Sequence, residues 1–575
     1  LLRPNLDSDN GNGPVSSPVS APTNDNDDDA EDDIHETNTE IDVAASTTET
    51  SESVPKSTPE DQSSPETTTN VDQSTPEETT NVDQSTPETL TSVDQSVPEE
   101  TTTNVAESTP DETKAAAAMG IDNGPAAKSG YRVSGSSGQC TYPGPIIRLK
   151  RGVKHGLFLK GGSEETNLHL HGLHIKGYGN GDNNHRFVKG SDNMLVYDID
   201  LPADQHMGGT HWYHSHIHGN TWEQVQGGAF GMIIIDDNGH PVGTEDANVL
   251  EFLRTSKHEK VLIIDDSKKS NSYTANGMES EVLEFVQNQW YRLRILTVGV
   301  DAHTSGINVI FDDYDADACH IHAMAHDGIF RFEVPRPHTV KEYPLTTASR
   351  LDVAIRCKQD IVIKVNGQQI VEVRTSEEEE AEEGTPYPGG STASWKSARL
   401  EYTKNLTSEN AEETMKLRVD ETNINGVSQA SHKPMCNKNT KGDFQYGTIQ
   451  EWKFSGVNTH PFHVHVYPMQ VVSDGCGPNH DKGEFYDTIL APESSISKPC
   501  IVRLYFVDIY GPTTVHCHIY EHAKHGAITW FNVIKDDDAN PVDEVGATSC
   551  QGQCTEPTEP PALCSSRRNL LRANY

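Results

Sequence analysis

HCHIYEHAKHG occupies residues 516–526 and holds four histidines and one cysteine. Similar strings occur earlier in the chain, as HLHGLH at 169–174, HWYHSH at 211–216 and HPFHVH at 460–465. These strings and the residues just beside them account for 14 of the 27 histidines. Side chains alternate between the two faces of a β-strand, so an H-x-H pair points two imidazoles the same way. The strings therefore predict strands that present clustered imidazoles to metal ions.

The order of residues within the strings predicts two groups of metal donors, back to back. Cys517 lies between two histidines of one strand, so its thiol points to the opposite face, toward His460 and His522. One cysteine with two histidines and a weak or absent axial ligand is the blue-copper arrangement, and clustered neutral imidazoles suit copper, zinc or iron. The remaining donors are four H-x-H pairs, enough for three copper ions: His169 and His171, His214 and His216, His463 and His465, His516 and His518.

Two simpler interpretations account less well for the histidines. A single H-x-H pair is most often an ordinary strand or surface pair, because isolated histidines mostly carry no metal. The concentration of histidines in four short windows argues against this interpretation. A zinc cluster is disfavoured because structural zinc sites close with four ligands, far fewer than the donors present here.

At these strings the chain resembles the multicopper oxidase family, which includes laccases, ferroxidases, ascorbate oxidase and bilirubin oxidase. The resemblance covers roughly residues 130 to 540, and the four strings match the family's four copper signatures in order. Supporting matches are QCTYPGPIIRLKRG (139–152), GNGDN (179–183), IDLPADQHMGGTHWYHSHIHG (199–219) and QGGAFGMIIID (226–236).

The resemblance implies four copper ions per chain and assigns their ligands. The type 1 copper would bind His460, Cys517 and His522, and the type 2 copper His169 and His463. The two type 3 coppers would bind two sets of three: His171, His214 and His518; His216, His465 and His516. A reducing substrate would then give single electrons to the type 1 copper. Four electrons would reduce dioxygen to two waters.

Two further positions bear on this expected chemistry. Asp182 in GNGDN aligns with the family's carboxylate near the type 2 copper, where an acid can relay protons. The alternative is an ordinary turn in which Asp182 satisfies backbone groups. Ala527 stands where the family usually carries Met, Leu or Phe beside the type 1 copper. Alanine cannot bind a metal, so we expect a medium-to-high type 1 potential.

The substrate is less well specified than the reaction. We expect a laccase-like oxidase of phenol-type compounds, with oxidation of Fe(II) or Mn(II) as the alternative. A different class of function is a non-catalytic, cation-binding matrix protein in which the copper centres are vestigial; retention of all the ligands argues against it. A two-copper nitrite reductase is disfavoured because its sites do not need all four H-x-H pairs.

The fold expected from residue 125 onward is all-β, in three cupredoxin-like Greek-key β-sandwich domains. Short alternating strands such as GMIIID (231–236) and DIVIKV (360–365), bounded by turn-forming residues, predict sandwiches rather than βαβ units. The expected segments are the domains 125–240, 241–375 and 390–540, an acidic linker at 376–389 and a cysteine-containing extension at 541–575. Ligands from the first and third domains would meet at their interface.

Residues 1–124 are expected to form a long disordered tail. The first 114 residues carry 28 acids against 3 bases and few aromatic residues, too little apolar surface for a core. Repeats of 11 or 12 residues fill 61–105, a period too short and polar for a solenoid. Such a Ser/Thr/Pro-rich acidic segment is typical of O-glycosylated stalks. It is either a plain spacer or a ligand for a cationic or cell-surface partner.

The cysteines and targeting signals favour an extracellular setting. Nine cysteines besides Cys517 suggest disulfides in a secreted or cell-surface protein. Asn405 begins a glycosylation sequon. The sequence contains no apolar run of 18 or more residues, so it predicts no membrane span. We expect no nucleic-acid partner for a chain of net charge −42.

One string outside the four signatures also contains metal-binding residue types. FDDYDADACHIHAMAHD (311–327) places His320 and His322 near several aspartates. It is either an additional metal site or, as we favour, a loop followed by a strand.

Overall fold

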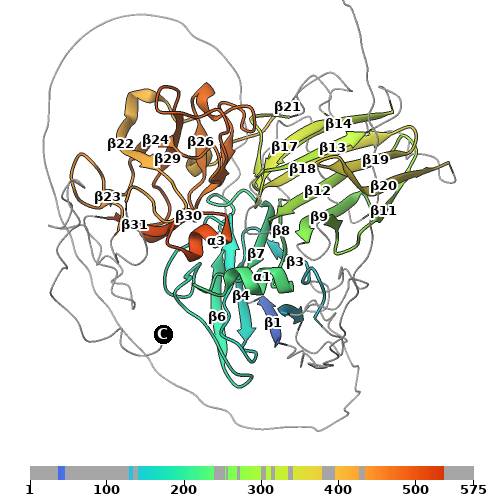
Figure 1. Ribbon diagram of the computed structural model, residues 1–575, viewed down its shortest axis with the longest axis horizontal. Coiled ribbons are helices and arrows are strands. Elements are labelled where there is room, and N and C mark those ends of the chain that lie inside the picture. The colour runs from blue at the N-terminus through green and yellow to red at the C-terminus, as the bar shows by residue number, and fades with distance from the viewer. Residues whose placement is uncertain are drawn as a thin grey trace, which may run out of the picture. The chain divides into compact units, whose positions relative to one another are not determined.

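The computed structural model describes residues 37–45, 129–133, 140–237, 253, 257–267, 272–299, 306–312, 318–334, 341–377, 395–426 and 434–535. Strands dominate these residues, and three pairs of sheets follow one another along the chain (Figure 1). The all-β, cupredoxin-like architecture expected from the sequence is confirmed. None of the helices in the described part of the chain is long and apolar enough to span a bilayer.

The first sandwich consists of two four-stranded sheets, in the strand orders β2-β1-β4-β6 and β3-β8-β7-β5. Leu157 and Leu159 alternate with more exposed residues on β4 and are fully buried, as expected for a strand with one face in the core. The strands are β1 (Thr37–Ala45), β2 (Ser129–Val133), β3 (Ile147–Lys150), β4 (Lys154–Lys160), β5 (His169–His171), β6 (Met194–Asp200), β7 (Gly209–His214) and β8 (Phe230–Asp236), with helix α1 (Thr221–Gly227) before β8.

The middle sandwich pairs a six-stranded sheet, β10-β9-β12-β18-β14-β15, with a five-stranded sheet, β11-β20-β19-β13-β17. A separate two-stranded sheet pairs β16 with β21. The strands are β9 (Glu259–Ser267), β10 (Ser272–Ala275), β11 (Glu281–Val286), β12 (Trp290–Val298), β13 (Gly306–Asp312), β14 (Cys319–His326), β15 (Ile329–Phe330), β16 (Glu333–Val334), β17 (Glu342–Thr346), β18 (Arg350–Cys357), β19 (Ile361–Val365), β20 (Gln368–Ser376) and β21 (Trp395–Lys396).

The third sandwich pairs two five-stranded sheets, β22-β24-β29-β26-β27 and β23-β31-β30-β25-β28. Its core packs Trp452, Phe506 and Phe531 against one another. The strands are β22 (Ala411–Arg418), β23 (Phe444–Gln445), β24 (Ile449–Ser455), β25 (Phe462–Val464), β26 (Met469–Val471), β27 (Phe485–Tyr486), β28 (Thr488–Ile489), β29 (Cys500–Tyr505), β30 (Gly511–Cys517) and β31 (Ile528–Ile534). The short helices are η2 (Glu401–Thr403), η3 (Ser408–Asn410), η5 (Asp474–Cys476) and α3 (Tyr520–Lys524).

Buried contacts join the sandwiches to one another. One apolar cluster contains Met207 of the first sandwich, Met324 of the middle one and Phe485 of the third. Between the first and middle sandwiches, Thr210 on β7 donates a hydrogen bond to Asp352 on β18, at 2.6 Å. A fully buried arginine of β12, Arg292, pairs with the same carboxylate. These contacts fix β7, which carries histidines of the metal strings, against the middle sandwich.

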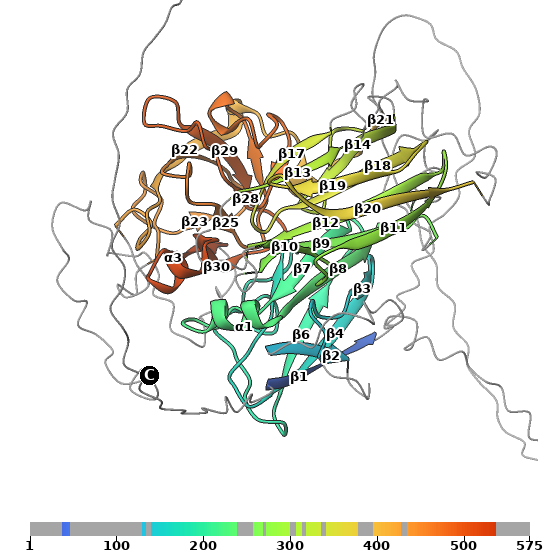
Figure 2. The same cartoon turned by 45° about the vertical axis from the view of Figure 1, so that its right-hand side comes forward.

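One strand lies where the sequence predicted disorder. β1 pairs in parallel with β2 and antiparallel with β4, with Glu40 opposite both Arg132 and Lys160 (Figure 2). Residues 37–45, which the prediction included in the tail over 1–124, form this strand. Composition predicts whether a segment can build its own core, whereas β1 pairs its backbone with strands that the folded domain supplies. The repeats at 61–105 lie outside the described residues.

The other segment predictions are only partly open to comparison. The boundary at 240/241, most of the linker at 376–389 and the extension at 541–575 lie outside the described residues. Two disulfides join Cys319 to Cys357 and Cys476 to Cys500. The first links β14 to β18, whose paired residues include these two cysteines. Disulfides are thus present, as expected, within the middle and third sandwiches.

Candidate metal centre

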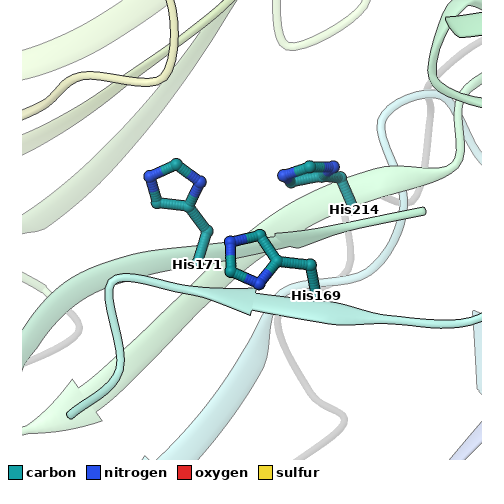
Figure 3. Close-up of side chains that lie close together, drawn as sticks. All are labelled: His169, His171 and His214. Atoms are coloured by element: carbon teal, nitrogen blue, oxygen red, sulfur yellow. The ribbon is translucent and has the colours of Figure 1, made fainter. Parts of the chain in front are cut away.

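Strand pairing brings the four H-x-H pairs together. On the first sandwich, His169 of β5 stands opposite His214 of β7. On the third, His463 of β25 stands opposite His516 of β30. Residues directly opposite on antiparallel strands point to the same face, with Cβ atoms about 5 Å apart. Figure 3 shows the rings of His169, His171 and His214 gathered on one side of their two strands.

The imidazoles of the first and third sandwiches meet in one buried chamber, which we call the histidine chamber. The Nε2 atoms of His169 and His463 are 3.3 Å apart, and those of His216 and His516 are 3.2 Å apart. The rings of His171 and His463 stack at 3.8 Å between centroids. The chamber has eight members, all buried: His169, His171, His214, His216, His463, His465, His516 and His518.

Most chamber histidines are held by one ring nitrogen, which leaves the other free to bind a metal. Carbonyl or carboxylate oxygens face that first nitrogen: Asp182 faces His169 and His465, Asp487 faces His171 and, through its carbonyl, His463, Ser215 faces His214, and Cys517 faces His516. Within the described residues, several of the other nitrogens have no hydrogen-bond partner: Nδ1 of His171, Nε2 of His214 and His465, and both nitrogens of His518. Buried polar atoms are rarely left unpaired, and ligating histidines characteristically anchor their second nitrogen this way. This donor set fits bound metal ions.

Burial keeps several of these imidazoles in the form that binds metals. Burial, reinforced by neighbouring histidines, lowers the pKa of His169, His216 and His463 well below the usual value. Burial lowers the pKa of His214 to about 3. Because a protonated imidazole has no lone pair to donate, rings that stay neutral across physiological pH are ready ligands.

A second group of donors lies on the other face of β30. The Cys517 sulfur is 3.5 Å from Nδ1 of His522 and 3.7 Å from Nδ1 of His460, and these two nitrogens are 3.0 Å apart. The chain reverses after β30 into α3, which returns His522 to the sulfur. Burial raises the pKa of Cys517 to about 12, so the thiolate that binds copper forms only when a cation replaces the proton.

The surroundings of Cys517 are apolar. Cys517 and Ala527 are fully buried in one hydrophobic cluster with Phe462. The Cys517 backbone N–H donates to the Ala527 carbonyl, and the Ala527 N–H donates to the His522 carbonyl, both at 2.9 Å. These bonds tie the backbone of Ala527 to those of Cys517 and His522. The methyl side chain of Ala527 cannot bind a metal.

The sets of donors that the sequence assigned to separate metals are largely found together. Several groups of three have all their donor atoms within 4.8 Å of one another: His460, Cys517 and His522; His216, His465 and His516; His169, His171 and His214; His169, His463 and His465. The expected set of His171, His214 and His518 is looser, with ring centroids 5.2 to 5.8 Å apart.

Asp182 contacts two chamber histidines rather than only its own turn. Its carboxylate faces Nδ1 of His169 at 2.8 Å and Nδ1 of His465 at 3.0 Å, and it accepts from the N–H of Leu170 at 2.8 Å. The backbone group that it satisfies therefore belongs to the histidine strand β5. Asp182 links a ring of the first sandwich to a ring of the third.

Sequence patterns did not reveal Asp487. Asp487 lies outside the four histidine strings, between β27 and β28, yet it contacts His171 and His463. The pairing of β25 with β28 brings it to the chamber.

The additional metal site considered at 311–327 receives no support from the described residues. Among the described residues, the groups of three or more side chains that could hold a metal ion do not include His320 or His322. His322 is buried on β14 with its ring 5.6 Å from that of Trp290, in an edge-to-face contact. Part of the aspartate-rich stretch, 313–317, lies outside the described residues.

Comparison with known proteins agrees with this geometry. Two sequence models described as multicopper oxidase match residues 127–240 and 404–537, the stretches that carry the histidine strings. A multicopper oxidase of Staphylococcus aureus is 24% identical over 412 residues, covering 68% of this chain and 82% of that protein. The chain belongs to the multicopper oxidase family. Members of this family are copper-containing oxidoreductases that use O2, and this chain is one of them.

Other relatives differ in the substrates that their names indicate. An iron transport multicopper oxidase of Kluyveromyces lactis is 26% identical, covering 38% of this chain and 34% of that protein. Among solved structures, a laccase of Pediococcus acidilactici has a TM-score of 0.54 at 20% identity, covering 68% of this chain and 84% of that chain. The McoA multicopper oxidase of Aquifex aeolicus has a TM-score of 0.53 at 19% identity, covering 68% and 89%. At these identities, the structural likeness concerns the fold.

Proposed function

We propose that this multicopper oxidase takes single electrons from a small reducing substrate beside Cys517 and uses four of them to reduce O2 to water in the histidine chamber. Bound copper supplies the electron transfer and the oxygen reduction. The proposed ligands are His460, Cys517 and His522 for the type 1 ion and His169 and His463 for the type 2 ion. Those for the type 3 pair are His171, His214, His518, His216, His465 and His516.

The observation that carries the proposal is the position of Cys517 between the two groups of donors. Its side chain faces His460 and His522, while the adjacent His516 points into the chamber, 3.2 Å from His216. A covalent path of a few bonds therefore joins the two groups. The strand β30 holds both ends of this path in one rigid element.

Protein side chains also serve the oxygen chemistry. The buried chamber excludes bulk water, which limits side reactions of partly reduced oxygen. Asp182 contacts two of the imidazoles, and its carboxylate is the proposed acid for passing protons to the chamber.

The first candidate substrate is a phenol-type reductant, as expected from the sequence. His522 is partly exposed, whereas Cys517 is fully buried. Electrons therefore enter most directly through a histidine edge, which a planar aromatic molecule can contact. The apolar surroundings of Cys517 and the methyl group of Ala527 are compatible with the medium-to-high potential that phenol oxidation needs.

A second candidate is oxidation of Fe(II) or Mn(II), which one observation favours. Burial lowers the pKa of His460, and the charges of Glu421 and Asp420 oppose that shift. The two carboxylates are therefore close enough to affect this histidine. Asp420 accepts backbone N–H groups of its own turn, whereas Glu421 is exposed. Carboxylates at this edge would attract a divalent cation and stabilise its oxidised form.

The setting remains part of the proposal. Disulfides in two sandwiches suit secretion or the cell surface. The acidic tail would then act as a spacer or contact a cationic surface.

The deciding experiment is oxygen uptake by copper-loaded protein with a phenol, Fe(II) and Mn(II) in one buffer. Cys517→Ser should abolish uptake with every substrate, and uptake that survives this change would contradict the proposal. Faster uptake with the phenol supports the first candidate. For the second, Glu421→Gln should raise the KM for the metal ion only, whereas Glu409→Gln, a change at an exposed acid in η3, should leave it unchanged.

A further inference from the structure

A buried arginine of the middle sandwich reaches the histidine chamber through one carboxylate. Arg350 is the first residue of β18 and is fully buried. Its Nη1 donates to Oδ1 of Asp487 at 3.0 Å, and its Nη2 donates to Oδ2. This two-pronged pair crosses from the middle sandwich to the third. The geometry of two parallel N–H···O bonds fixes the plane of the carboxylate as well as its position.

Asp487 contacts two chamber histidines, one with its side chain and one with its backbone. Oδ1 faces Nε2 of His171 at 3.1 Å, and the carbonyl oxygen faces Nδ1 of His463 at 2.8 Å. A carboxylate and a carbonyl can only accept, so both imidazoles must donate N–H at these contacts. The lone pairs of the two rings are thereby placed on the opposite nitrogens.

For His171 this leaves Nδ1 as the ligand atom. Within the described residues, Nδ1 of His171 is buried and has no hydrogen-bond partner. The ring also stacks on that of His463, which Asp487 holds through its backbone. Asp487 therefore selects the tautomer of His171 and orients both rings.

Arg350 is itself held from several directions. Nη1 donates to the Ala348 carbonyl at 2.7 Å, and the backbone N–H donates to Asp327 at 2.9 Å. Asp327 also accepts from the N–H of Asp487 at 3.0 Å. The arginine, Asp327 and Asp487 form a closed unit, so Asp487 cannot shift without breaking several bonds at once.

Gly172, the residue after His171, leaves the space that the Arg350–Asp487 ion pair occupies. Gly172 has φ +87°, and a Cβ there would lie 2.7 Å from Oδ2 of Asp487 and still closer to Nη2 of Arg350. A side chain at this position would displace the ion pair. The first, middle and third sandwiches thus meet at Gly172, Arg350 and Asp487.

We propose that Arg350 is a positioning residue for copper binding: through Asp487 it fixes the ring and tautomer of His171, so that the middle sandwich controls a site to which it gives no ligand. The inference rests on the proposed function of the histidine chamber. Asp487 also lies within ligand distance of His171 and His463. Because the carboxylate of Asp487 is already paired with the Arg350 guanidinium, Asp487 accepts hydrogen bonds from these rings and does not bind a metal ion.

The test measures copper per chain by elemental analysis after dialysis against chelator-buffered Cu(II), together with the blue absorption of the Cys517 site. In Arg350→Ala, the chamber should bind Cu(II) about 10- to 100-fold more weakly, as expected when an outer hydrogen-bond partner of a ligand is removed. The blue absorption should persist. Arg350→Lys should restore little, because one ammonium cannot reproduce the two-pronged pair.

Arg292 provides the matched control. It is an equally buried arginine of the middle sandwich, and it pairs with Asp237 and Asp352 rather than Asp487. Arg292→Lys should lose stability without selective loss of chamber copper. If Arg350→Ala does not fold, the comparison of Arg350→Lys with Arg292→Lys decides the question. Equal copper binding by these two lysine variants would overturn the proposal.

A double variant tests whether the effect passes through Asp487. If Arg350 acts only by holding this carboxylate, Arg350→Ala together with Asp487→Ala should weaken Cu(II) binding no more than Asp487→Ala alone. Additive losses would refute this route. If the unmodified protein itself shows no blue absorption and no oxygen uptake, the proposed function fails. If the unmodified protein shows both signals and the Arg350 variants bind Cu(II) as tightly as it does, only this inference fails.

Discussion

Asp182 offers the sharpest test of how the chamber is organised. Replacing it with asparagine keeps one oxygen and turns the other into an NH2 group. The retained oxygen can still accept from Leu170 N–H and His169 Nδ1, both at 2.8 Å. The new NH2 group then faces Nδ1 of His465, 3.0 Å from the present oxygen. Two donors cannot bond to each other, so Asp182→Asn removes the anchor of His465 while sparing that of His169.

The size of the effect follows from the bond that is lost. A hydrogen bond to a buried charged group contributes about 1.5–3 kcal/mol. Since about 1.4 kcal/mol corresponds to a factor of ten, copper affinity at the chamber should fall roughly 10- to 100-fold. Copper titration monitored by elemental analysis measures this. Asp198→Asn, a change at an exposed carboxylate of the same sandwich, should have no effect.

Oxygen uptake at saturating copper separates positioning from proton transfer. If Asp182 also relays protons, Asp182→Asn should lower the rate by about 10²- to 10⁴-fold even when fully loaded, the usual contribution of a general acid. If it only positions His465, adding copper should restore the rate. Unchanged copper affinity and an unchanged rate would refute both roles and the reasoning from hydrogen bonds behind them.

Three further predictions concern stability. Burial raises the pKa of Asp265 to about 7 from an ordinary 3.8, so the folded state loses stability as pH rises through this window; at 1.36 kcal/mol per pKa unit the loss is about 4 kcal/mol. Chemical denaturation at pH 5 and 8 should therefore show a smaller pH dependence for Asp265→Asn, and equal pH dependence in both proteins would contradict the assignment. Deleting residues 1–45 should lower the melting temperature because it leaves the facing edges of β2 and β4 unpaired, whereas deleting 1–36 should not; equal melting temperatures would show that β1 adds no stability. Free copper at 100 times its dissociation constant should stabilise the fold by about 2.7 kcal/mol per site, seen by calorimetry as a melting temperature that falls on chelation; no shift would argue against sites that form only in the folded state.

The sequence could predict which side chains point the same way because strand periodicity is local. H-x-H spacing forces two imidazoles to one face and Cys517 to the other, whatever surrounds the strand. Short apolar runs bounded by turn-forming residues likewise predicted strands such as β8 and β19 and hence the all-β class. These properties depend on neighbours along the chain, which the sequence states directly.

The tertiary structure decided what lies around those donors. Asp487 and Arg350 belong to no motif. Asp487 contacts His171, and Arg350 contacts Asp487, because strands from three sandwiches converge at Gly172. The strand β1 was hidden for a related reason, since its partners are backbone groups of β2 and β4. Local pattern therefore determined which atoms can bind metal. Long-range packing determined which nitrogen rings such as His171 and His465 offer, because their hydrogen-bond partners, Asp487 and Asp182, lie far from them in the chain.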